Sequence, residues 1–455
     1  MIKLRALSIS LLAFFIFTGC STEKEEPTKT VVIQGELINF DNATKTLSAR
    51  GSLASLTGIQ NVELSVDANN RFSTSFVLEE EGYFSVGRNQ LYLSPGDSLV
   101  VSLDYMDPNK ATFEGKGAEV NRYLMDVPFP KSGSYLSGGR EVKSPDVQDI
   151  VKLADTENAA RLSKLENVKN ASAKFIEFEK LRLDLDYINT LESFPIYASF
   201  KDYFEFSDEN WIKAMTPAKE ILNEKTANLD QNKYMEHPNF RDMLGVFGNE
   251  KFRNSGFFTD FSLTPEMKEF QKTESFLYSL KNAGLVDSIV VQSKTVMAEL
   301  KNPDYQNAIE YTLSSYNSLD PGHAAYDFVM NTESGEKHPL SEYKGKVIYV
   351  DFWATWCGPC IAEEPAYEQL KEDYKGKDIE FLSVSIDTNV KAWENYIQKK
   401  GWTEKTYLIS QAELADYKIN GIPRYLLIDE NFNIVTAFAP RPSEEKVRTM
   451  IDELL

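Results

Sequence analysis

The chain has 455 residues, with 49 lysines and arginines against 69 aspartates and glutamates, so its formal net charge is −20. A strongly acidic chain is repelled by phosphate groups, which argues against nucleic acid or an anionic lipid surface as its partner. Its length predicts about three domains, at roughly 150 residues for each. After the N-terminus, no segment reaches the roughly 18 consecutive apolar residues that indicate a membrane-spanning helix.

The N-terminus has the layout of a secretory signal. Lys3 and Arg5 precede an apolar run at residues 6–17, and Gly19-Cys20 follows it. The run is too short to span a membrane. We therefore expect residues 1–19 to be a signal peptide. The segment resembles a bacterial lipoprotein signal, which implies cleavage before Cys20, lipidation of that cysteine and attachment to a membrane through the lipid.

Residues 20–29 are polar and acidic, and we interpret them as a lipidated tether. They resemble the surface-export signals of Bacteroidetes lipoproteins, although an ordinary solvated linker would have the same composition. From residue 30 to 117, apolar and polar residues alternate with a period of two, as at Val62, Leu64 and Val66. Short strands separated by turns such as Asn69-Asn70 predict an antiparallel β-sandwich or small barrel.

Residues 118–320 change to a helical period and are expected to form an all-α region. One long apolar stripe extends from Leu162 to Ile188. A stripe of this kind forms the inner face of a helical bundle more often than a partner groove or a ligand pocket. The sequence indicates no substrate for this region.

Residues 322–455 alternate between strand and helix, which predicts an α/β fold with helices on both faces of a mixed sheet. The apolar run 347–350 leads into Trp356-Cys357-Gly358-Pro359-Cys360. Two cysteines at the start of a helix place the first sulfur at the positive end of the helix dipole, which stabilises a thiolate. The second sulfur is close enough to form a disulfide, so the pair can exchange electrons with other dithiols. A zinc site is not expected, because structural zinc takes four ligands and the three histidines have no suitable spacing.

This segment resembles thioredoxin, and in particular the TlpA/ResA-like branch of membrane-tethered thiol–disulfide oxidoreductases. The resemblance covers about residues 322–455. Glu363 and Pro365 match that branch's C-x-x-E-x-P pattern, and Gly421-Ile422-Pro423 resembles its cis-proline loop. In Bacteroidetes lipoproteins, a β-rich N-terminal domain often precedes such a domain, as it does here. The resemblance implies a thioredoxin-like fold and a redox-active disulfide with no other cofactor; AhpC/TSA-like proteins share this fold.

Individual residues can be given roles on this basis. Cys357, the more exposed sulfur, is the expected nucleophile, and Cys360 is the resolving thiol. Asp351 is either a buried base that takes the proton of Cys360 or an edge residue that reaches water. By resemblance Glu363 tunes the cysteine pKa values, although an acidic residue also suits the first helical turn. Glu364 is expected to face solvent.

Docking of an extended client chain is expected beside the disulfide. The resemblance implies that the cis proline exposes backbone groups there. Trp353 is interpreted either as part of this surface or as core, and the charge of Arg424 as a possible determinant of partner choice. The residues expected to contact the client are Trp356, Gly358, Pro359, Ile422 and Pro423.

Taken together, these features predict a membrane-anchored thiol–disulfide oxidoreductase of the cell envelope, facing the periplasm or the outer surface. We expect it to act as a reductant of client protein disulfides. Because extracytoplasmic compartments oxidise thiols, it would need an electron donor, and we expect a membrane thiol-electron transporter in this role. The direction of electron flow is not written in the residues. An alternative is a binding or structural lipoprotein in which the thioredoxin-like domain is an accessory or redox sensor.

Overall fold

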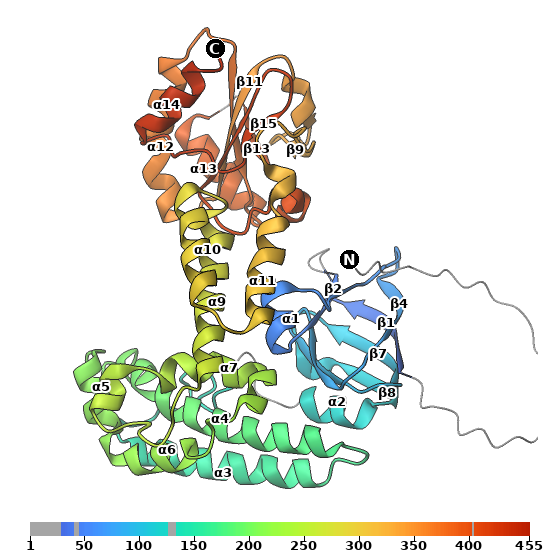
Figure 1. Cartoon of the computed structure of the whole chain (residues 1–455), viewed down its shortest axis with the longest axis vertical. Helices are drawn as coiled ribbons and strands as arrows, with labels where there is room; N and C mark the ends of the chain where they lie inside the picture. Colours follow the sequence, from blue (N-terminus) through green and yellow to red (C-terminus); the bar gives the residue numbers. More distant parts are fainter. Residues whose placement is uncertain (1–28, 41–44, 126–132, 403–404) are drawn as a thin grey trace, which may run out of the picture.

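The computed structural model describes residues 29–40, 45–125, 133–402 and 405–455. Figure 1 shows β-sheets near the N-terminus, a set of long helices, and an α/β domain at the C-terminus that sits on the end of the helices α9 to α11. Within the described residues, no helix combines the length and the apolar character that crossing a membrane would need. The expected signal peptide, Cys20 and residues 21–28 of the expected tether lie outside the described residues.

The N-terminal part contains two four-stranded sheets that share one hydrophobic core. Val31 and Leu99 enter this core from the first sheet, and Phe84 and Leu91 enter it from the second. The short helix α1 (Ser52–Thr57) lies at the edge of the second sheet. In sheet order, the strands are β4 (Arg71–Val77), β1 (Thr30–Ile38), β7 (Ser98–Asp104) and β8 (Thr112–Lys116), then β3 (Val62–Glu63), β2 (Thr46–Ala49), β5 (Gly82–Val86) and β6 (Asn89–Leu93).

The expected antiparallel sandwich or barrel is not confirmed. β1 and β7 pair in parallel, with Val32 opposite Ser98, and the described strands of neither sheet close into a barrel. The period-two pattern identifies strands and their buried faces, but it carries no information on strand direction. Two strands that are more than sixty residues apart can therefore pair in either sense without a change in the local sequence pattern.

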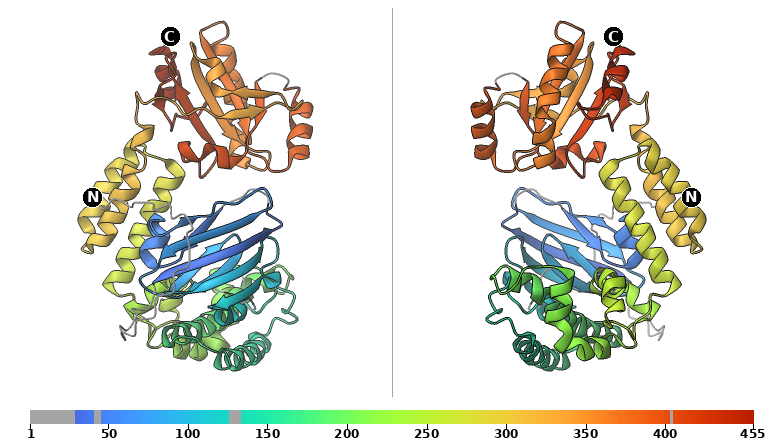
Figure 2. Two further views of the ribbon diagram at one scale, coloured as in Figure 1. Left: turned by 90° about the vertical axis from the view of Figure 1, so that its right-hand side faces the viewer. Right: turned by 90° about the vertical axis from the view of Figure 1, so that its left-hand side faces the viewer.

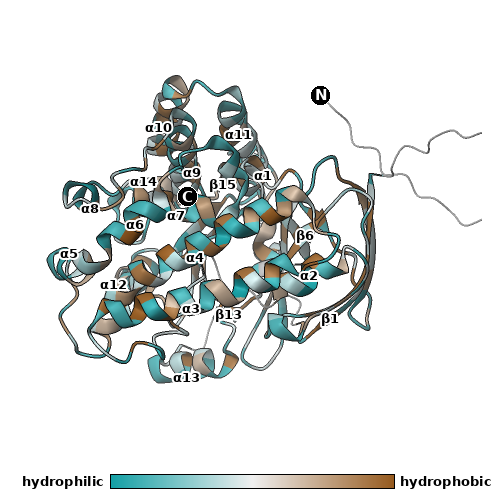
Figure 3. Cartoon of the chain, turned by 90° about the horizontal axis from the view of Figure 1, so that it is seen from below, coloured by the Kyte–Doolittle hydropathy of each residue, from teal (hydrophilic) through white to brown (hydrophobic). Residues whose placement is uncertain are grey.

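The middle of the chain is helical, and its longest helices lie side by side (Figure 3). The stripe from Leu162 to Ile188 is split between two of them, because Asn170 adopts a left-handed backbone and Ser172 then caps a new helix. The helices are α2 (Ala118–Met125), α3 (Val147–Glu166), α4 (Ala173–Ser199), α5 (Asp208–Met215), α6 (Lys219–Thr226), α7 (Pro238–Phe247), α8 (Glu250–Asn254), α9 (Pro265–Ala283), α10 (Asp287–Glu299) and α11 (Pro303–Ser314).

A buried charge cluster joins the sheets to α4. Arg182 donates to Glu179 at 2.7 Å and to Asp186 at 2.5 Å, and the three side chains are fully buried. Tyr83 of β5 donates its hydroxyl to Glu179 at 2.6 Å. The ion pairs lie within α4, and the hydrogen bond from Tyr83 links them to the N-terminal sheets; losing it would leave a buried carboxylate short of one donor.

The C-terminal domain is built on a seven-stranded mixed sheet. The central strand β11 runs parallel to β12 and antiparallel to β14. The helices α12 and α14 cover one face of the sheet, and α13 covers the other. In sheet order, the strands are β10 (Lys337–Pro339), β9 (Val329–Asn331), β13 (Thr406–Leu408), β12 (Ile379–Ser385), β11 (Val347–Trp353), β14 (Arg424–Ile428) and β15 (Ile434–Thr436), with the helices α12 (Gly358–Asp373), α13 (Val390–Lys400) and α14 (Glu445–Asp452).

The end of α9 holds this domain in place. Gly284, directly after α9, has φ +77°, and a Cβ atom there would lie 1.9 Å from a ring carbon of Phe438. Only glycine fits such an approach without displacement. One continuous hydrophobic core extends from the helices into the sheet of the C-terminal domain. Figure 2 shows that this docking also brings the C-terminal domain over the N-terminal sheets.

Candidate active site

The two cysteines lie where the central strand passes into a helix. β11 ends at Trp353, and Cys357 is the N-cap of α12. Its Sγ accepts a hydrogen bond from the backbone N–H of Cys360 at 3.2 Å. The two residues form a disulfide with their Cα atoms 5.3 Å apart. The sulfur of Cys357 therefore sits at the positive end of the α12 dipole, which favours a thiolate after reduction.

The redox pair is buried, and the tryptophan beside it is exposed. In this oxidised structure, Cys357 and Cys360 are each 5% exposed as whole residues. Trp356 is 67% exposed beside them, and Gly358 and Pro359 are exposed in the first turn of α12. Trp353 is core, because it is buried against the rings of Tyr396 and Trp402.

Asp351 lies on the face of the sheet that α12 covers, since its alternate neighbour Tyr349 packs with Tyr367 of that helix. Its Oδ1 atom is buried and has no hydrogen-bond partner in the described residues. Burial, followed by the nearby charges of Glu364 and Glu363, raises the pKa of Asp351 to about 8. A carboxyl group in such a site holds a proton near neutral pH and can exchange it with a thiol.

The two glutamates of α12 are both held by neighbouring elements. Glu363 accepts hydrogen bonds from the backbone N–H and the hydroxyl of Ser443, at 3.2 and 3.0 Å. Glu364 was expected to face solvent, and this expectation was wrong. Its side chain is only 12% exposed and accepts from Tyr396 at 2.5 Å and Lys400 at 2.6 Å. The sequence could not show that α13 would cover this residue.

The loop before β14 flanks the end of β11. The Ile422–Pro423 peptide bond is cis, as the sequence predicted. Phe352 pairs with Arg424, so Pro423 follows in register opposite Trp353, at the entrance to the cysteine loop. Ile422 is partly buried against the main core.

Arg424 does not face a client. It is buried, and its guanidinium donates to the carbonyls of Asn282 and Ala283 at the end of α9, at 2.6 and 3.5 Å. It also stacks 4.6 Å from the centroid of Phe438. Burial without a carboxylate partner lowers its pKa to about 10. The residue caps a helix of the same chain, which a single sequence cannot reveal.

Sequence reasoning also missed Asp387. This buried carboxylate accepts from the backbone N–H of Thr355 at 2.9 Å and from its hydroxyl at 2.7 Å, and it accepts from Ser385 at 2.7 Å. It thereby holds the loop that leads to Cys357. The only signal in the sequence is an acidic residue directly after an apolar strand. Among the described residues, no group of three His, Cys, Asp or Glu side chains is placed to hold a metal ion.

A disulfide at the head of a helix that follows the central strand of such a sheet, beside a cis-proline loop, defines a thioredoxin-like thiol–disulfide oxidoreductase. Residues 320–454 match the Redoxin family. Thiol-disulfide oxidoreductase ResA of Geobacillus kaustophilus is 28% identical over 153 residues, which cover 32% of this chain and 88% of that protein. Thioredoxin-like protein YneN of Bacillus subtilis is 34% identical over 115 residues, covering 25% of this chain and 67% of that protein.

Among solved structures, a crystal structure described as a thiol–disulfide oxidoreductase from Bacteroides vulgatus is 48% identical, with a TM-score of 0.30. The match covers 30% of this chain and 99% of that one. Through its C-terminal domain, the chain belongs to the Redoxin family of thioredoxin-like proteins, and its activity is thiol–disulfide exchange.

Proposed function

We propose that the protein is a membrane-anchored reductant of the cell envelope, which reduces disulfides of client proteins through Cys357 and Cys360. The observation that carries this proposal is the redox pair at the head of α12 with the buried Asp351 carboxyl on the sheet face beneath that helix. The lipoprotein-like segment ending at Cys20 supports the anchor.

The exchange proceeds in two steps. In the reduced enzyme, the Cys357 thiolate attacks one sulfur of a client disulfide. The Cys357–client bond forms, the client S–S bond breaks, and one client thiolate leaves. The Cys360 thiolate then attacks Cys357 Sγ and releases the second client thiolate. The client has gained two electrons, and the Cys357–Cys360 disulfide remains.

Asp351 serves as the base for the second step. Cys360 must lose a proton before it can attack, and it is as buried as Cys357. A carboxyl pKa of about 8 is close to the ordinary thiol pKa of about 8.5, so transfer of the proton is nearly balanced. Glu363 and Glu364 contribute by holding negative charge near Asp351, which keeps its pKa high.

Exposed and half-buried groups around the disulfide form the docking surface for the client. Trp356 offers a large exposed apolar face, with Gly358 and Pro359 beside it. Ile422 and Pro423 present the backbone of the loop opposite Trp353. A membrane thiol-electron transporter then reduces the Cys357–Cys360 disulfide to two thiols, and no cofactor other than this pair is needed.

The reduction potential of the pair tests the direction of electron flow. We expect a value near that of thioredoxin, about −270 mV, when the chain from Ser21 is equilibrated with dithiothreitol or glutathione buffers. A value near about −120 mV, typical of a strong disulfide oxidant, would contradict the reductant role. Failure to exchange with any disulfide would instead favour a binding lipoprotein in which the C-terminal domain is a sensor.

A further inference from the structure

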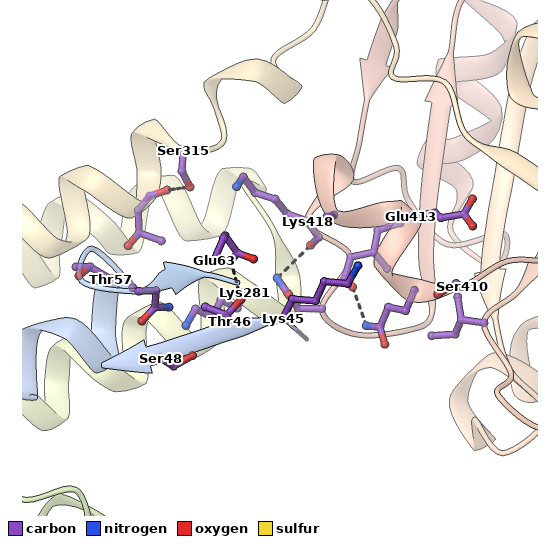
Figure 4. Close-up of a pocket in the computed structure, with 18 of the residues that line it drawn as sticks. Lys45, Thr46, Ser48, Thr57, Glu63, Lys281, Ser315, Ser410, Glu413 and Lys418 are labelled. Carbon is purple, nitrogen blue, oxygen red and sulfur yellow. Dashed lines mark hydrogen bonds between the residues drawn. The ribbon is translucent and has the colours of Figure 1, made fainter. Parts of the chain in front are cut away.

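A large cleft lies between the three parts of the chain, and its volume is about 1580 Å³. The N-terminal sheets and α1 contribute residues 45–46, 48–50 and 54–58, Asn61 and Glu63 to its lining. The helices α9 and α11 and the turn after α11 contribute Lys281, Tyr311, Thr312, Ser315 and Tyr316, and the C-terminal domain contributes residues 386–388, 408–411 and 418–420 together with Glu413 and Ala415. Figure 4 shows side chains from all three parts around the same opening. Small-molecule pockets usually measure about 300–1,000 Å³, so this space suits several residues of an extended chain better than a small ligand.

The cleft begins beside the loop that connects β11 to Cys357. Ile386, which lines it, donates its backbone N–H to the carbonyl of Trp353 at 2.9 Å. Asp387, also in the lining, holds Thr355, which is two residues from Cys357. On the other side of β11, the lining residue Asn420 lies three residues before Pro423. The cleft therefore extends outward from the two loops that flank the disulfide.

The opposite side of the cis-proline loop is occupied by α9. A Cβ atom on Gly421 would lie 3.5 Å from Oδ1 of Asn282, and Arg424 binds the carbonyls at the helix end. A client chain that follows this loop is blocked by α9 on that side. The cleft is the space into which its flanking residues can continue.

Three lysines of the cleft have no ion-pair partner among the described residues. Lys45, Lys281 and Lys418 reach it from three different elements (Figure 4), and none of them pairs with a carboxylate in the described residues. The carboxylate of Asp387 also lines the cleft and accepts hydrogen bonds from Thr355 and Ser385. With Glu63 and Glu413, three carboxylates line the cleft, and the three lysines with Arg50 outnumber them by one. In a chain of net charge −20, this local excess is unusual.

We propose that the cleft binds an acidic, extended segment of the client polypeptide next to the cysteine that Cys357 attacks. This inference rests on the proposed function, since it assigns the client segment that the redox site selects. A cleft with unpaired cationic groups attracts the opposite charge and raises association rates. The N-terminal sheets and the helices then act in client recognition, because each supplies one wall and one lysine.

Stopped-flow kinetics of the reduced full chain from Ser21 test the proposal. The substrates are peptide disulfide dimers in which the cysteine is flanked by glutamates, glutamines or lysines, and oxidation of the enzyme is followed by tryptophan fluorescence. Each rate is divided by the rate of the same peptide with dithiothreitol, which removes the intrinsic effect of neighbouring charges on the sulfur. We expect the glutamate peptide to react about tenfold faster than the glutamine peptide at low salt, with the advantage falling as salt is added.

A matched pair of charge-reversal variants locates the effect. A triple variant should abolish or invert the preference for the glutamate peptide; it carries Lys45→Glu, Lys281→Glu and Lys418→Glu. The control variant changes the net charge equally and should keep this preference. It reverses three exposed lysines outside the cleft, Lys169, Lys301 and Lys399. If the triple variant does not fold, Lys281→Glu alone, at an exposed position, should reduce the preference.

Equal normalised rates for the three peptides with the unmodified chain would overturn the proposal. So would a preference that survives reversal of the cleft lysines. Hydroxyethyl disulfide, which is small and uncharged, separates this failure from failure of the proposed function. Reaction with it shows that the redox site works whatever the cleft does, and no reaction with any disulfide would contradict the function itself.

Discussion

Replacing Asp351 with asparagine should stabilise the C-terminal domain at neutral pH and slow its catalysis. The Asp351 carboxyl is buried, its Oδ1 has no hydrogen-bond partner among the described residues, and its pKa is raised from 3.8 to about 8. The folded state therefore binds more protons than the unfolded state between these two pKa values. Stability contributed by the protonated carboxyl is fully present below about pH 3.8 and is lost as the pH rises toward 8.

The size of this effect follows from the shift. One pKa unit corresponds to about 1.4 kcal/mol, so at pH 7 the aspartate costs about 4 kcal/mol relative to a group that never ionises. Asparagine keeps the shape and stays neutral, although its buried amide costs about 1–3 kcal/mol if it finds no partner. That cost does not change with pH. The difference in unfolding free energy between Asp351→Asn and the parent should therefore grow by about 4 kcal/mol between about pH 5 and pH 8.

Urea denaturation of the oxidised protein at several pH values measures this difference. Of the five tryptophans, Trp353, Trp356, Trp393 and Trp402 lie in the C-terminal domain, so fluorescence reports mainly on its unfolding. Asp378→Asn, at an exposed carboxylate before β12, is the control and should show no such pH dependence. A stability difference that stays constant from pH 5 to pH 8 would refute the buried-base interpretation. In the reduced enzyme, the variant should also resolve mixed disulfides more slowly, with the deficit shrinking at high pH, where Cys360 ionises unaided.

Three further predictions concern other parts of the molecule. Cys360→Ser should trap client proteins on Cys357 as mixed disulfides on non-reducing gels, whereas Cys357→Ser should trap none. Gly284→Ala should loosen the docking of the C-terminal domain and increase hydrogen exchange around α9 and β14, whereas Gly376→Ala should not, since it shares the positive φ but has no neighbour within 4 Å. His237→Phe should make the folded state less sensitive to acid unfolding. Burial holds the pKa of His237 well below its usual range, so the parent should lose stability, relative to the variant, as the pH falls below about 6.5. Equal acid unfolding of the two proteins would contradict this.

The redox centre was predictable because its chemistry is local in sequence. Trp356, the two cysteines and Pro359 lie within five consecutive positions, and the helix they begin supplies the dipole whatever the rest of the chain does. Asp351 could be singled out for a similar reason, since aspartate is rare in strands and one within an apolar central strand suggests a functional role. The equal burial of the two cysteine residues was not, because both belong to the main core, which segments distant in the sequence build together.

What the sequence could not provide depends on contacts between distant segments. Arg424 has the appearance of a surface charge until the carbonyls at the end of α9, more than 140 residues away, are placed beside it. Glu364 has the appearance of a solvent-facing residue until α13 supplies Tyr396 and Lys400. The parallel pairing of β1 with β7 has no local signature either.

The same long-range contacts bear on why so much of the chain precedes the redox domain. If the front of the chain were a spacer, a flexible connection to the C-terminal domain would serve. Instead, Gly284 and Arg424 fix that domain on α9, and the Arg182 cluster fixes the N-terminal sheets on α4. Both attachments lose free energy if the parts separate, because Arg424 would lose the carbonyls of Asn282 and Ala283, and the buried Glu179 would lose the hydroxyl of Tyr83. The two fixed attachments hold the walls of the cleft at a set distance from the disulfide, as a recognition site requires and a spacer does not.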